Sequence, residues 1–94
     1  MDDRTANVGT DQPTRQMTKG EYRVGLDFNP SGNADVNAIK RAAADLIDYI
    51  ESVPKPEHAT DEQKAEIGRL KALAQTHIED AAMWGVKAAT KRPR

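Results

Sequence analysis

The sequence of 94 residues is long enough for a single domain, and its formal net charge of −1 creates no general attraction to nucleic acid or to an anionic membrane. We therefore expect no DNA, RNA or membrane partner. The chain contains no cysteine, which excludes disulfides, zinc–thiolate sites and thiol nucleophiles, and two histidines alone cannot hold a metal. Because it has no apolar run of the roughly 20 residues that cross a bilayer, we expect a cytoplasmic protein.

The first 32 residues divide into two parts. Residues 1–20 contain few apolar side chains, too few to offset the entropy lost on ordering, and we predict a flexible arm there. Residues 21–32 place apolar side chains at alternate positions before an Asn-Pro-Ser-Gly turn: Tyr22, Val24, Leu26 and Phe28. This spacing is typical of extended chain. Because a lone strand has no partner, we expect ordered coil lying across a helical surface.

A first amphipathic helix is predicted over about 34–53. Apolar side chains recur there at spacings of three and four, and most charged side chains lie off that line. Pro54 and Pro56 end the helix, because proline lacks an amide donor and disfavours helix in the residue before it.

A second, longer helix is predicted over 61–90. Thr60 can cap its first turn, and Gln63 stands where it completes a capping box. No proline interrupts the segment before Pro93. Residues 21–94 are therefore expected to form one all-α domain, an antiparallel two-helix hairpin preceded by coil.

The apolar surface of the second helix is too broad for one partner helix. One heptad line runs along it, formed by Ile67, Leu70, Ala74, His77, Ala81, Trp84 and Ala88, and further apolar residues fill other faces. A helix that is apolar on several sides needs several neighbours, and the chain supplies only one of them. We therefore predict a compact helical homo-oligomer.

The sequence contains no catalytic motif. There is no phosphate-binding loop, dinucleotide-binding fingerprint or nucleophile elbow, and a two-helix hairpin offers no deep pocket within one chain. Pairs of acidic residues on the helices are more typical of a solvated face than of acid–base catalysis. We interpret His77 as an interface residue. The sequence thus predicts no enzyme, no catalytic residue, no metal site and no cofactor.

The candidate binding residues lie around the start of the first helix. Phe28 stands beside Asn29 and Pro30 at a turn, where its ring could stack on a base while Asn29 donates hydrogen bonds. The alternative is that Phe28 is a hydrophobic staple at the start of the helix. Lys40 could reach a phosphate, as could the free amides at the helix N-terminus. Arg69 is a weaker candidate, because a lone arginine on a helix is usually solvated.

Two segments of the chain resemble a known family. These are FNPSGNADVNAIKRAAADLIDYIE and EIGRLKALAQTHIEDAAMWGVKAA, of which the second contains a Glu-x-Ala-x-Met-Trp run at residues 79–84. They are similar to the small phage-encoded anti-CBASS sponge proteins of the second type, which sequester cyclic oligonucleotides. The resemblance extends over about residues 22–90, and its Met-Trp ending is more specific than the alanine-rich helix before it.

The resemblance implies a function that needs no catalyst. Members of the family assemble as helical homohexamers and bind cyclic dinucleotides of the cyclic GMP–AMP type between protomers, so that CBASS effectors in the host cytoplasm stay inactive. An N-terminal aromatic residue stacks on a base and a basic residue of the first long helix contacts phosphate; Phe28, next to Asn29 and Pro30, and Lys40 match these. Cyclic trinucleotides bind near the three-fold axes, where Arg69 is the best match. The chain departs from the family in a longer arm and a shorter spacing between the two residues.

A different class of function stays open at this point. The chain could be a structural or regulatory helical oligomer whose apolar helix docks onto a partner protein. Ligand-induced thermal stabilisation separates the two, since a pure interaction protein should not respond to cyclic nucleotides.

Overall fold

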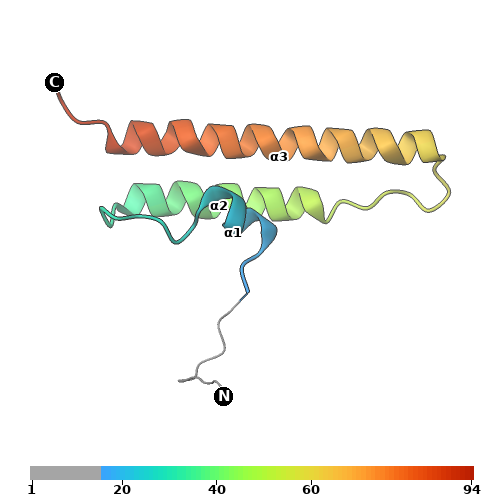
Figure 1. Ribbon diagram of the computed structural model, residues 1–94, viewed down its shortest axis with the longest axis horizontal. Coiled ribbons are helices and arrows are strands. Elements are labelled where there is room, and N and C mark those ends of the chain that lie inside the picture. The colour runs from blue at the N-terminus through green and yellow to red at the C-terminus, as the bar shows by residue number, and fades with distance from the viewer. Residues whose placement is uncertain (1–15) are drawn as a thin grey trace, which may run out of the picture.

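The computed structural model describes residues 16–94, which form three helices: α1 (Lys19–Val24), α2 (Ala34–Glu51) and α3 (Asp61–Thr90). Within this part of the chain all regular structure is helical. α2 and α3 run antiparallel, side by side, and α3 extends well past the end of α2 (Figure 1). The predicted all-α hairpin is thereby confirmed. Of the helices that the structure describes, none is long and apolar enough to cross a membrane.

Both long helices begin at the caps that their sequences provide. The Asn33 side chain accepts hydrogen bonds from the amides of Asp35 and Val36, at 2.8 and 3.1 Å. At α3, Thr60 and Gln63 form the predicted capping box, with reciprocal bonds of 3.1 and 2.9 Å. α3 ends where the sequence predicts, whereas α2 ends at Glu51, two residues before the predicted boundary.

The helix α1 corrects the prediction for the segment before α2. Residues 21–32 were predicted as extended coil, but Lys19–Val24 is helical. Thr18 caps α1 in a capping box with Glu21, and Gly25, at φ 65°, ends the helix in the left-handed conformation that glycine adopts without strain. α1 also begins inside the segment predicted as a flexible arm, whose residues 1–15 lie outside the described part.

Polar contacts attach α1 to the hairpin. The Gly20 amide donates to the Asp48 carboxylate at 2.7 Å, and the buried Glu21 carboxylate pairs with Arg41 at 3.0 Å. The Lys19 ammonium lies 2.9 Å from the carboxylate of Glu51, which is also on α2. These bonds all come from the first turn of a six-residue helix, which is too short to be stable alone. α1 therefore depends on α2 for its position.

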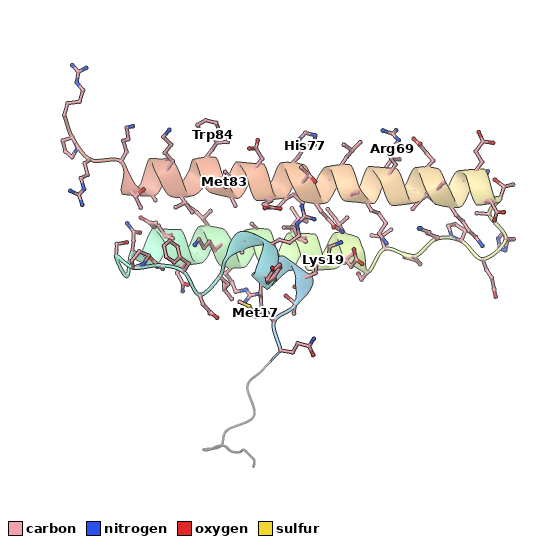
Figure 2. The ribbon with its side chains drawn as sticks, viewed as in Figure 1. Met17, Lys19, Arg69, His77, Met83 and Trp84 are labelled. Carbon is pink, nitrogen blue, oxygen red and sulfur yellow. The ribbon has the colours of Figure 1, made fainter. Side chains whose placement is uncertain are left out.

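The core of the hairpin is small. Its buried apolar residues in the described part are Val36, Ala44 and Ile47 of α2 and Ala82 of α3, with the amide of Gln75 enclosed beside them. The heptad line of α3 lies outside this core. Trp84 is 63 % exposed and Leu70 50 % exposed, and Figure 2 shows Trp84 and His77 on the side of α3 that faces away from α2.

Candidate functional site

The turn between α1 and α2, residues 25–33, presents Phe28 to solvent. The Phe28 side chain is 72 % exposed, so it is no staple for α2. Its amide donates to the Gly25 carbonyl at 3.0 Å. Asn29 closes the rest of the turn, because its amide nitrogen donates to the Asn33 carbonyl at 2.8 Å and its oxygen accepts from the Asn33 amide at 3.2 Å. The Asn29 amide, predicted to face a ligand, is thus engaged within the turn.

Lys40 reaches this turn from the middle of α2. Only 7 % of the residue is exposed, and its ammonium donates to the main-chain carbonyls of Gly25, at 2.9 Å, and Phe28. The same ammonium lies 5.5 Å from the centroid of the Phe28 ring, within the range of a cation–π contact. The structure therefore brings together Phe28 and Lys40, which are twelve residues apart in the sequence.

Two cavities share Lys40 in their walls. The first, of about 240 Å³, lies between the turn, α2 and α3, and its walls include Phe28, Asn29, Pro30, Val36, Lys40 and Thr90. The second, of about 250 Å³, lies beside α1, and its walls include Arg23, Val24, Lys40, Glu79 and Met83. Val86 lines both. We call the two together the groove; one of its sides is a stripe of α3 in which residues 79, 83, 86 and 90 recur every three or four positions.

Arg23 is a groove residue that sequence reasoning missed. Its guanidinium pairs with the Glu79 carboxylate at 2.7 Å and also donates to Gln75 and Thr76, each at 3.4 Å. The sequence pattern does not point to Arg23 as a binding residue, because it predicts coil for this segment. The signal that could have found it is the capping box formed by Thr18 and Glu21, which places a helix before residue 25.

Arg69 lies apart from the groove. It stands on the outer side of α3 with Trp84 (Figure 2), and its guanidinium pairs with the Glu66 carboxylate at 2.7 Å. This hydrogen bond raises the pKa of Arg69 and lowers the pKa of Glu66. The amides at the start of α2 are also not free, because Asn33 bonds those of residues 35 and 36. The groove thus contains four of the five predicted residues.

The groups in the groove suit the binding of a ligand. It offers an exposed ring, one buried ammonium and one guanidinium that is already paired. In the part of the chain that the structure describes, no three histidine or acidic side chains gather as they would around a metal ion. These groups can stack on a planar ring and attract an anion.

A comparison with protein families shows which family contains this chain. A family model described as "Acb2/Tad1, hairpin domain" matches residues 20–90, about three quarters of the chain. The chain belongs to the Acb2/Tad1 hairpin-domain family. This is the family of anti-CBASS protein 2, the cyclic-oligonucleotide sponges, so the resemblance seen in the sequence is confirmed. The match contains both long helices, all of α1 except its first residue, Lys19, and every residue that we place in the groove. Neither the curated proteins nor the solved structures gave a match.

Proposed function

We propose that this Acb2/Tad1 hairpin protein is a phage anti-defence protein that binds cyclic di- and trinucleotide messengers of the cyclic GMP–AMP type without cleaving them. Sequestration in the host cytoplasm keeps the messenger from CBASS effectors, which then stay inactive by mass action. One observation carries the proposal beyond family membership: Phe28 is 72 % exposed, and the Lys40 ammonium lies 5.5 Å from its ring.

The groups of the groove suit the chemistry of a cyclic dinucleotide. Such a ligand has two bases and two phosphates, and the ring of Phe28 offers a face for one base. An ammonium has three N–H donors, of which Lys40 directs two at carbonyls, so one donor is left for a phosphate. Asn29 closes the turn that carries the ring, and Pro30 lines the cavity beside it.

The exposure of Phe28 supports a site completed by a second protomer. The residue is 72 % exposed, so a base stacked on its ring would keep its other face in solvent. Because ligand sites bury most of their ligand, we expect a second protomer to cover that face. The exposed heptad line of α3, with Trp84 and Leu70, provides a surface for the homo-oligomer that we propose, a hexamer as in the family.

Cyclic trinucleotides are assigned to a separate site at Arg69. This guanidinium is exposed and faces away from α2 (Figure 2), and it pairs with the Glu66 carboxylate, which a phosphate would have to replace. Copies of Arg69 that meet at a three-fold axis would give one cation to each phosphate of a cyclic trinucleotide.

Isothermal titration calorimetry tests this function. The full chain is titrated with cyclic GMP–AMP, with cyclic tri-adenylate and with the linear dinucleotide of the same bases. We expect both cyclic ligands to bind, the linear one to bind more weakly, and chromatography to recover the cyclic ligands intact. If an oligomer forms but none of the three binds, the chain is instead a structural oligomer that docks onto a partner protein.

A further inference from the structure

The direction of the Phe28 ring depends on its backbone. Because most of the ring is exposed, packing alone does not hold it in one place. The turn that carries it begins at Gly25, whose left-handed conformation ends α1, and contains the bond from the Phe28 amide to the Gly25 carbonyl. A pre-oriented ring can stack on a base without first losing conformational freedom.

Lys40 bonds the two carbonyls that define this part of the turn. Its ammonium donates to the main-chain carbonyls of Gly25 and Phe28. At 7 % exposure, the ammonium would be left buried and poorly solvated if the turn moved away. Movement of Phe28 is therefore coupled to the loss of hydrogen bonds from a buried cation.

We infer that Lys40 is a positioning residue for Phe28, in that its buried ammonium holds the 25–28 turn and so presents the ring to the ligand. The effect of Lys40 on cyclic-dinucleotide binding rests on the proposed function, but its effect on the turn does not. A second lysine offers a matched control. Lys71 donates to the carbonyls of Glu51 and Val53, at 2.9 and 2.6 Å, at the far end of α2.

The first test uses the ligand-free protein and hydrogen exchange measured by mass spectrometry. Lys40→Met keeps the length of the side chain and removes its donors. The peptide covering residues 25–33 should exchange about tenfold faster or more, as expected for lost bonds to a charged donor, while peptides of α3 stay protected. Lys40→Arg should restore part of the protection, and Lys71→Met should leave this peptide unchanged. Unchanged exchange of residues 25–33 in Lys40→Met overturns the inference.

A second measurement needs no substitution in the measured protein. NMR of the lysine ammonium groups should show slow proton exchange for Lys40, because hydrogen bonds and burial shield it from water. Lys91, which is exposed beyond the end of α3, should exchange fast. A Lys40 ammonium that exchanges as fast as Lys91 would contradict the inference even if Lys40→Met failed to fold.

A double-mutant cycle with cyclic GMP–AMP separates positioning from a direct phosphate contact. If Lys40 positions Phe28 as well as contacting a phosphate, then Lys40→Met should weaken binding clearly less in the Phe28→Ala background than in the parent, where we expect a loss of about tenfold. Losses that multiply would show independent action and overturn the inference. A parent protein that binds no cyclic dinucleotide would sink the proposed function instead, and the exchange experiments would still decide the role of Lys40.

Discussion

Gly20 of α1 lies directly against the backbone of Ala44 in α2. A β-carbon at position 20 would stand 2.9 Å from the Ala44 Cα and closer still to its carbonyl oxygen, and backbone atoms in a helix cannot move aside. The close approach allows the Gly20 amide to reach Asp48. This contact sets the distance between α1 and α2, and with it the place where the turn begins.

Gly20→Ala should therefore displace α1 from α2. We expect faster hydrogen exchange in residues 18–25 and a lower midpoint of urea unfolding. Gly68→Ala is the control, because its β-carbon would meet only the flexible end of Lys55, and alanine favours helix by about 1 kcal/mol. That variant should be as stable as the parent or more so. Equal exchange of α1 in Gly20→Ala and the parent would show that the contact is not needed.

Phe28→Ala should weaken cyclic-dinucleotide binding by about 1–3 kcal/mol, the value of stacking one base on an aromatic ring. Because stacking is not a charge interaction, the loss should be nearly the same at low and high ionic strength. Calorimetry at two salt concentrations measures it. Tyr22→Ala removes another exposed ring, one that lies outside the groove, and should bind like the parent. Parent-like binding by Phe28→Ala would place the base elsewhere.

Ala81→Glu should dissociate the oligomer, because it places a charge on the heptad line and costs several kcal/mol if the line is buried between protomers. Light scattering measures the mass. Trp84→Ala should weaken the assembly while leaving the protomer folded, since the ring is 63 % exposed in one protomer. Ala65→Glu, exposed and off the line, is the control. An intact Ala81→Glu oligomer would show that this face remains in solvent.

Arg69→Ala should abolish binding of cyclic tri-adenylate and leave cyclic-dinucleotide binding nearly unchanged, because Arg69 lies outside the groove. Glu66→Gln provides the opposite change. It removes the carboxylate that pairs with Arg69 at 2.7 Å, and so should strengthen trinucleotide binding. Calorimetry measures the affinity of the two variants for both ligands. If Arg69→Ala loses both ligands equally, its role is in the fold.

Acid should weaken the attachment of α1 through Glu51. Hydrogen bonds from Gln75 and then Lys19, with the nearby charge of Lys71, hold the pKa of this carboxylate below its usual 4.5. The folded state thus favours the ionised form. Its contribution is complete above pH 4.5 and is lost as the pH falls through the lowered value.

Glu51→Gln should accordingly be less stable than the parent at neutral pH, and the difference should vanish under acid. Urea unfolding midpoints measured across this pH range give the comparison. Glu57→Gln removes an exposed carboxylate of the α2–α3 loop and controls for the general loss of charge. A difference between Glu51→Gln and the parent that persists unchanged into acid would contradict the assignment.

The long helices could be predicted from the sequence because their signals repeat. Three- and four-residue spacing over 18 and 30 residues, with the capping box at Thr60, indicates helix at many positions. α1 is only six residues long, and Tyr22 and Val24 in it happen to fit an alternating pattern. Its position depends on Gly20 and on polar partners in α2, which local sequence does not reveal.

The groove could be predicted only in part, for a related reason. Phe28 and Lys40 were identifiable by their chemistry, and the turn that joins them was visible in the sequence at Asn29 and Pro30. The partners of Lys40 are main-chain carbonyls, which every residue has, so no sequence pattern predicts them. Arg23 could not be assigned to the groove until α1 was known to be a helix.

Two kinds of contact stabilise the molecule, because α1 is attached through polar contacts with Asp48, Arg41 and Glu51. Apolar burial joins α2 to α3 around residues such as Ile47, whereas charges and amide bonds hold α1. Screening by salt acts on the second kind of contact and leaves the first almost unchanged. Salt should therefore favour local opening of α1, and of the turn that presents Phe28, while the hairpin stays closed.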